Sequence, residues 1–173
     1  DFEKAKETMK FIKERKWNSA IKSSEKVSDR EFRNLITWMY LKTTGNSATF
    51  NDYKKFIDRN SDYPRINRIK YLAEKKIYLR NTSPTSVINW FNQNPPLGGI
   101  GKIKLAEAYL EQGKTEEVQK LIKDAWVNAE ISKNDLGYYR AKFKKFLTSE
   151  DHLKRADYLA WERKYWDLKR MLK

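Results

Sequence analysis

The residues that could carry out chemistry in this chain are few. His152 is the only histidine among 173 residues, and cysteine is absent. Zinc sites are built mainly from histidine and cysteine ligands, and a histidine that acts as a general base needs an organised partner. We therefore expect His152 to have a structural role in the first turn of a helix, such as a hydrogen bond to a neighbouring helix. No metal site and no cofactor is predicted.

Two pairs of adjacent acids are the other candidates for catalysis. Glycosidases generally use two carboxylates that flank the scissile bond. Glu116–Glu117 and Glu150–Asp151 are neighbours in sequence, but each pair falls in the first turn of an expected helix, where acids favour the helix dipole. Adjacent residues on a helix also point in different directions. We expect neither pair to be catalytic, and no catalytic residue is predicted.

A glycine-rich segment, Leu97-Gly98-Gly99-Ile100-Gly101, resembles a phosphate-binding loop only superficially. It lacks the Lys-Ser or Lys-Thr ending of such loops, and no strand precedes it. The pattern predicts a turn between helices.

Aromatic residues are frequent, with six tryptophans and ten tyrosines, and such rings could stack on sugars or bases. Most of them fall on the apolar stripes of expected helices, so core packing is the default interpretation. Trp166 interrupts the stripe of its helix, and Trp90 and Trp126 lie near helix ends. These three are the candidates for surface aromatics that bind a ligand.

Charge constrains the class of partner more than the fold. The net charge is +14, from 37 basic and 23 acidic residues, so nucleic acid, anionic lipid and anionic cell-wall polymers are all candidates. The lysines either form ordinary solvated helix faces or line a concave surface that attracts anionic glycan strands. No apolar run approaches the about 20 residues of a membrane span, and the lack of cysteine suits the periplasm and the cytosol equally.

The spacing of apolar residues predicts an all-α protein made of helical hairpins. Residues 106–122 align without a gap on residues 156–172, and residues 8–24 give a third, weaker copy. One hairpin cannot bury its own apolar face, whereas stacked hairpins can. We expect a single domain over residues 1–173, an irregular right-handed α-superhelix of the TPR-like or α-solenoid type with about 10–11 helices.

Sequence signals also place the ends of several helices. Ser28, Thr49, Ser83, Ser132 and Ser149 are predicted N-caps, because their hydroxyls can accept from free backbone N–H groups. Pro64 is predicted at the start of a helix, where its missing N–H is not needed. Helices are expected over residues 2–14 and 17–27, from the Ser28 cap to about 41, and over 49–60, 64–77 and about 87–91. Further helices are expected over 101–112, 115–129 and 132–147 and in the hairpin 149–173.

The most specific pattern lies between Glu150 and Trp161. It resembles the motif E/D-D-H-x-x-R-x-D-x-L-x-W of the N-terminal superhelical region of soluble lytic murein transglycosylases of the alphaproteobacterial type. The residues that match are Asp151, His152, Arg155, Asp157, Leu159 and Trp161. Earlier segments agree more loosely, at 38–41, 62–64 and 94–96. We expect the matching residues to be structural.

The resemblance implies a non-catalytic part of a periplasmic enzyme. In that family an α-superhelix precedes a lysozyme-like domain, which cleaves the β-1,4 bond between N-acetylmuramic acid and N-acetylglucosamine and leaves a 1,6-anhydro end. The catalytic Glu-Ser and Gly-Leu-Met-Gln segments do not occur in this sequence. We therefore expect an inactive scaffold whose chain continues past Lys173, with glycan strands, the catalytic domain of the same chain and other cell-wall proteins as its partners.

A second interpretation comes from a different class of protein. Basic residues interleaved with aromatic residues also occur in helical-repeat modules of the cytosol that bind RNA or a protein partner. Helical-repeat RNA readers use regular repeats, with one base read by equivalent positions of each repeat. The uneven spacing of the hairpins disfavours RNA, while a protein partner stays open.

Overall fold

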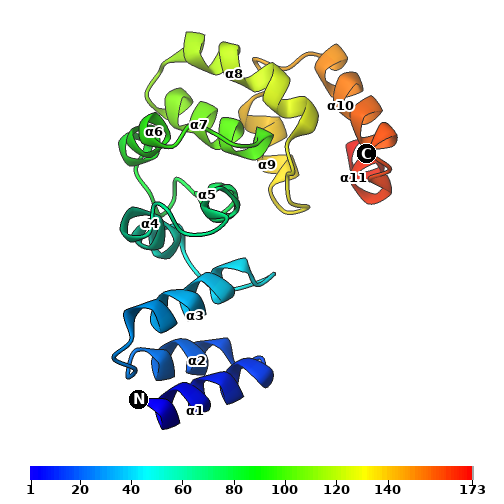
Figure 1. Ribbon diagram of the computed structural model, residues 1–173. Helices are drawn as coiled ribbons and strands as arrows, with labels where there is room; N and C mark the ends of the chain where they lie inside the picture. Colours follow the sequence, from blue (N-terminus) through cyan, green and yellow to red (C-terminus); the bar gives the residue numbers. More distant parts are fainter. Residues whose placement is uncertain (173) are drawn as a thin grey trace. The chain divides into compact units, whose positions relative to one another are not determined.

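The structure is a computed structural model that describes residues 1–172, and it is helical throughout, with no strand in that range (Figure 1). The expected all-α fold is therefore confirmed. The helices of the described residues are α1 (Phe2–Lys13), α2 (Trp17–Ser24), α3 (Arg30–Lys42), α4 (Phe50–Arg59), α5 (Ile66–Glu74), α6 (Pro84–Gln93), α7 (Gly99–Glu111), α8 (Thr115–Asn128), α9 (Leu136–Lys142), α10 (Ser149–Trp161) and α11 (Tyr165–Met171). None of these helices is long and apolar enough to cross a membrane.

The chain divides into two compact units. Unit 1 spans Asp1–Ala73 and unit 2 spans Glu74–Lys173, so the boundary falls at the last residue of α5. Each unit has its own buried residues and is described separately below.

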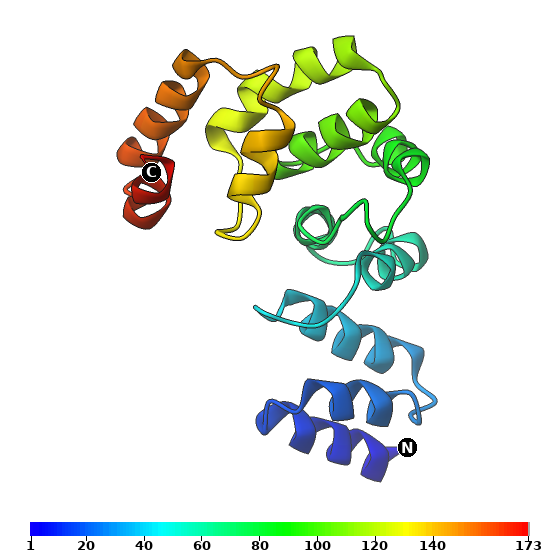
Figure 2. The ribbon, with the colours of Figure 1, turned by 180° about the vertical axis from the view of Figure 1, so that it is seen from behind.

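In unit 1, each of the helices α1 to α3 packs on the next one along the chain. α1 packs on α2, α2 on α3, and α3 on α4, and α1, α2 and α3 lie one above another in a stack (Figures 1 and 2). Ile36 and Tyr53 are fully buried in this stack. The Tyr53 hydroxyl donates to the carbonyl of Leu41 at 2.6 Å and accepts from the Asn46 amide at 2.9 Å, so it fastens the loop between α3 and α4 to the core.

In unit 2 the helices also pack on helices that are close to them in the chain, around a larger core. α6 packs on α7, α7 on α8, α8 on α10, and α10 on α11 (Figure 2). In α9 and the turn after it, Tyr139 and Phe143 are buried while Leu136 and Phe146 pack against the core from its edge. α7 lies between α6 and α8, and its residues 103–108 are buried all round.

The three hairpins that align in sequence share one turn conformation. In each of them the residue that lies two positions after the end of the first helix is left-handed, with φ of 56° at Arg15, 72° at Gly113 and 55° at Arg163. The next N–H then donates to a carbonyl five residues earlier, as in a Schellman motif. These bonds are Lys16 to Phe11 (2.9 Å), Lys114 to Tyr109 (2.9 Å) and Lys164 to Leu159 (2.8 Å).

The predicted N-caps are partly confirmed. Thr49 and Ser83 cap α4 and α6 as expected. The cap of α3 is Asp29 and not Ser28, because the Asp29 carboxylate accepts from the Phe32 N–H at 3.0 Å. The cap of α10 is Thr148 and not Ser149. In both cases two adjacent residues can cap, and the structure uses the neighbour of the predicted one.

Two other helix starts were predicted too early. Pro64 precedes α5, which begins at Ile66 after Arg65 adopts a left-handed φ of 56°. Ser132 accepts from the Asp135 N–H at 3.1 Å as predicted, but this bond closes a turn and α9 begins only at Leu136. The helix predicted over 132–147 is therefore much shorter.

Candidate functional site

Four residues of the 151–161 motif join α10 to the core of unit 2. Asp151 is 5% exposed and completes a capping box, in which its carboxylate accepts from the Thr148 N–H at 2.8 Å. Leu159 is 2% exposed and belongs to the core. The structural role expected for these positions is thus visible in the contacts of Asp151 and Leu159, and in those of His152 and Arg155 described next.

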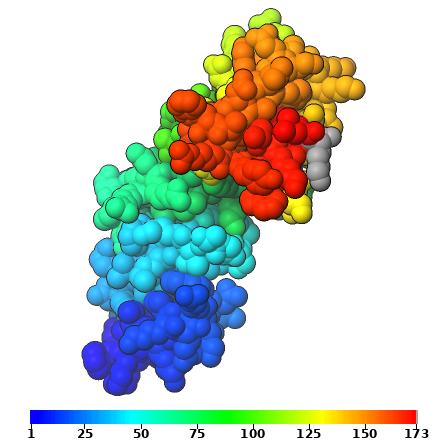
Figure 3. Space-filling view, turned by 90° about the vertical axis from the view of Figure 1, so that its right-hand side faces the viewer, coloured from blue at the N-terminus to red at the C-terminus, as the bar shows by residue number. Residues whose placement is uncertain are grey.

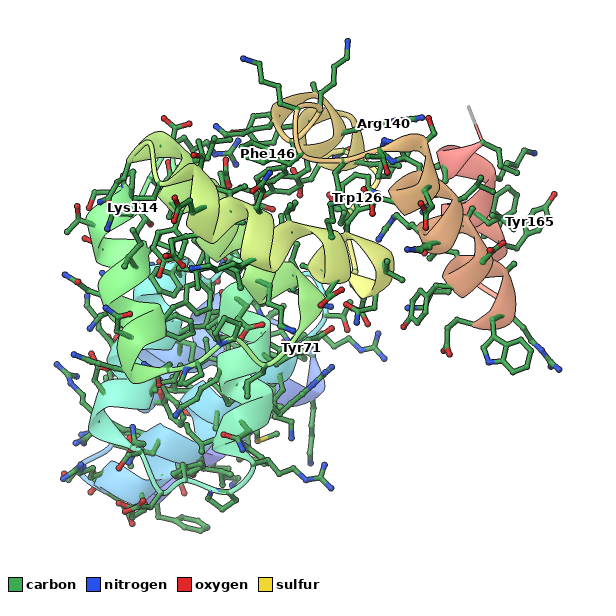
Figure 4. All side chains as sticks on the ribbon, turned by 90° about the horizontal axis from the view of Figure 1, so that it is seen from above. Tyr71, Lys114, Trp126, Arg140, Phe146 and Tyr165 are labelled. Atoms are coloured by element: carbon green, nitrogen blue, oxygen red, sulfur yellow. The ribbon has the colours of Figure 1, made fainter. Side chains whose placement is uncertain are left out.

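His152 contacts α8 through Trp126. The indole N–H of Trp126 donates to His152 Nδ1 at 3.1 Å, and the two rings meet edge to face with centroids 5.5 Å apart (Figure 4). An accepting Nδ1 carries no proton, so the neutral imidazole fits this contact. Burial, together with the nearby charges of Arg140 and Arg155, lowers the pKa of His152 below its ordinary value. The predicted hydrogen bond to a neighbouring helix is confirmed.

Arg155 caps the end of α8. It is 2% exposed, and its Nη1 donates to the carbonyl oxygens of Trp126 and Ala129, the latter at 3.0 Å. A cation at the C-terminal end of a helix interacts favourably with the helix dipole and with the free carbonyl groups. Burial lowers the pKa of Arg155 to about 10, yet the group stays charged at neutral pH.

The other two motif residues lie at the surface. Asp157 is exposed, and Trp161 is 85% exposed. Tyr165, which is labelled in Figure 4, and Trp166 are exposed as well, so α10 and α11 carry three exposed aromatic rings. Figure 3 shows the residues of these two helices, orange to red, at the surface of the face in view. Sequence reasoning did not single out Trp161 and Tyr165, because their positions lie beside or on the apolar stripes of this hairpin, of which Leu159 and Met171 are the members buried in the core.

The three candidate surface tryptophans behave differently. Trp166 is 66% exposed, as expected. Trp90 and Trp126 are 3% and 0% exposed, so their prediction as surface aromatics is wrong. Trp126 lies under α10, and Trp90 packs edge to face on Phe91 within unit 2. Their place near helix ends did not expose them, because the neighbouring segments cover those ends.

The acidic pairs do not form a catalytic arrangement. Glu150 points to solvent and pairs with Lys154 at 2.8 Å, while Asp151 is buried in its capping box. Glu117 pairs with Lys120 at 3.4 Å and Glu116 is exposed. Among residues 1–172 no group of His, Asp and Glu side chains could hold a metal ion.

The glycine-rich segment is a turn that leads into α7, as predicted, although α7 already begins at Gly99. Gly101 packs on the buried carboxyl group of Glu74: a Cβ at this position would lie 2.5 Å from the Glu74 carboxyl carbon. The same carboxylate accepts from the Leu97 N–H at 2.5 Å, so it holds the turn against the end of α5.

A buried lysine that sequence reasoning missed is the most unusual group of unit 2. Lys104 on α7 is 1% exposed, and its Nζ has no hydrogen-bond acceptor within the described chain. The ammonium group lies 3.9 Å from the centre of the Tyr78 ring and 5.2 Å from that of Tyr139. Burial lowers its pKa to about 8, although Asp135 and Glu107 oppose the shift.

Glu107, one turn after Lys104, is also buried but well satisfied. Its carboxylate accepts from the hydroxyl groups of Tyr138 (2.5 Å) and Tyr139 (3.4 Å), and Lys142 lies 3.6 Å away. Lys142 also pairs with Glu111 at 2.5 Å. Lys142 is therefore partly buried, whereas its neighbours Lys144 and Lys145 are exposed.

Lys104 and Arg155 line one pocket of about 380 Å³ in unit 2. Its walls come from α7, the segment after α8, α10 and the first residues of α11. The remaining lining residues are Lys75, Tyr78, Ile100, Ala129, Glu130, Ile131, Ser132, Asp135, Leu159, Lys164 and Asp167. The volume is within the range of small-molecule sites. The sequence feature that could have indicated this pocket is the presence of Lys104 and Glu107 inside the otherwise apolar run 103–108.

No protein-family model, no curated protein and no solved structure matches this chain. The site is therefore interpreted from its own geometry.

Proposed function

We propose that this chain is the non-catalytic helical scaffold of a periplasmic soluble lytic transglycosylase. It binds peptidoglycan strands and positions the catalytic domain. The hairpins stack into an irregular right-handed superhelix in this proposal. The observation that carries it is the joint between α8 and α10, which is built from the motif residues His152, Arg155 and Leu159, while Asp151 caps α10 and lies 4.0 Å from Lys123 of α8. A motif whose residues hold two hairpins together is the kind of signal expected from a shared scaffold.

The surface chemistry of unit 2 suits an anionic glycan with attached peptides. Trp161, Tyr165 and Trp166 are exposed on α10 and α11, and aromatic rings offer flat apolar faces beside a polar surface. The net charge of +14 attracts carboxylate-bearing polymers at a distance. Since no catalytic pair is formed, binding and not cleavage is the supported activity.

Cosedimentation with purified peptidoglycan sacculi tests this proposal. We expect retention at about 50 mM salt that weakens as salt rises, because the attraction between exposed charges is screened. The double substitution Trp161→Ala, Trp166→Ala should reduce retention several-fold. Phe2→Ala, which changes an aromatic residue that is 77% exposed in unit 1, is the matched control and should have no effect.

The contrary result would favour the second interpretation. If sacculi fail to retain the chain while single-stranded oligonucleotides bind tightly with a steep salt dependence, the chain is a nucleic-acid-binding repeat module and the proposal is wrong.

A further inference from the structure

Two buried cationic donors face the same pocket without an acceptor. Among residues 1–172, the buried side-chain donors that lack a hydrogen-bond partner include Lys104 Nζ and Arg155 Nε, and both residues line the pocket of about 380 Å³. Leaving a buried charged donor without an acceptor is unfavourable. A pair of such donors in one pocket therefore points to a ligand that supplies anionic oxygen atoms.

The other charges of the pocket leave it with an excess of positive charge. Glu130 pairs with Lys75 and Asp167 pairs with Arg170, so these two acids are already compensated. Asp135 accepts from the hydroxyl groups of Ser132 (2.7 Å) and Tyr78 (3.3 Å) and adds a carboxyl group to the wall. This acid would repel a dianionic phosphate more strongly than a singly charged carboxylate, which therefore suits the remaining cations better.

The rest of the lining is apolar. Ile100, Ala129, Ile131 and Leu159 contribute aliphatic surface to the pocket walls. A ligand that places a carboxylate at the cations therefore also needs a small aliphatic body. The carboxyl end of a short peptide with small side chains has both parts.

From these contacts we infer that the pocket binds the free carboxylate of a peptidoglycan stem peptide at Lys104 and Arg155. This inference rests on the proposed function, which it deepens by assigning the peptide part of the polymer to one pocket. The exposed aromatic rings of α10 and α11 are left for the sugar part.

Titration followed by backbone amide NMR tests the inference on the whole chain. The probe is N-acetyl-D-alanyl-D-alanine, and the matched control is the same dipeptide with its carboxyl group amidated. We expect the acid form of the dipeptide to shift the backbone N–H signals of segments 75–78, 100–104, 129–132 and 155–164. The amidated dipeptide should bind at least about tenfold more weakly, because it lacks the negative charge. Equal binding of the two probes would overturn the inference.

Lys104→Met separates binding from folding. The substitution removes the ammonium group but keeps a flexible apolar chain of similar length, so the melting temperature should rise while affinity for the acid falls at least about tenfold. Lys144→Met, which changes an exposed lysine outside the pocket, is the control and should bind like the wild type. Wild-type affinity in a folded Lys104→Met variant would contradict the assignment.

Sacculi treated to remove their peptides distinguish failure of the inference from failure of the proposed function. If the acid dipeptide does not bind and bare glycan retains the chain as well as intact sacculi do, the inference is wrong and the proposed function stands. If the dipeptide binds through Lys104 but neither form of sacculi retains the chain, the pocket is a carboxylate site, and both the stem peptide and the proposed function are excluded.

Discussion

Glu74, the last residue of α5, is a buried acid whose ionisation opposes folding. It is 0% exposed, one of its oxygens accepts from the Leu97 N–H, and burial raises its pKa to about 7. Its value in the unfolded chain is about 4.5. The folded state therefore binds the proton more tightly, and the stability contributed by protonated Glu74 is complete below pH 4.5 and is lost as pH rises through 7.

Glu74→Gln should remove this pH dependence. The amide keeps an oxygen that can accept from the Leu97 N–H, but it does not ionise. We expect the wild type to lose on the order of 2 kcal/mol of unfolding free energy between pH 5 and pH 8 through this group, and the variant to lose correspondingly less. Urea denaturation at both pH values measures the unfolding free energy of the wild type and of the variant. Glu116→Gln, at an exposed acid, should retain the wild-type profile.

At the scale of elements, the shared turn of the three hairpins contains a strained position. Arg163 and Arg15 adopt a left-handed φ where the third hairpin has Gly113, and a side chain makes this conformation unfavourable. Arg163→Gly should therefore raise the unfolding free energy by about 0.5–1 kcal/mol, as measured by thermal or urea unfolding.

Gly113→Ala is the reciprocal substitution. A Cβ at Gly113 would meet no atom within 4 Å, so any effect comes from the backbone conformation alone. It should lower stability by about 1 kcal/mol. A stabilising Gly113→Ala, or a destabilising Arg163→Gly, would show that the turn is not strained at this position.

The elements were predictable from sequence wherever apolar spacing or a cap decides the local structure. The caps of Thr49 and Ser83 are local features, and they were predicted correctly. The choice between two adjacent capping residues at the start of α3 was wrong, because both can accept from the same backbone groups.

The pocket was not predictable from sequence because it depends on how the helices stack. α7 is covered on both sides by α6 and α8, so Lys104 lies inside although lysine usually reaches solvent. Trp126 was wrongly predicted at the surface for the same reason. It is covered by α10, whose His152 lies 26 residues further along the chain. The pattern at 151–161 did indicate the positions that make this contact, but it did not indicate the pocket beside them.

At the scale of the whole molecule, the division into two units predicts local unfolding. Helical stacks whose contacts lie between neighbouring helices open in parts, since each element depends mainly on those next to it. Trp126→Ala, at a fully buried residue of unit 2, should reduce the protection of amides in 74–172 from hydrogen exchange. Amides in 1–73 should keep most of their protection.

Ile36→Ala is the matched substitution in unit 1, because Ile36 is also 0% exposed. It should show the reverse pattern, with protection lost in 1–73 and kept in 74–172. Equal loss of protection over both units in either variant would mean that the chain unfolds as one cooperative body.

The shared turn at Arg15, Gly113 and Arg163 also bears on how such a chain can change its length. Each of these turns lies inside its hairpin, between the two helices that it joins, so a hairpin that is gained or lost as a whole carries its own turn hydrogen bonds with it. A shorter insertion inside a helix would instead rotate every following residue about the helix axis and move its apolar face away from its neighbour. We therefore expect duplications and deletions to be tolerated in whole-hairpin steps, and chimaeras to fold best when they are joined between hairpins.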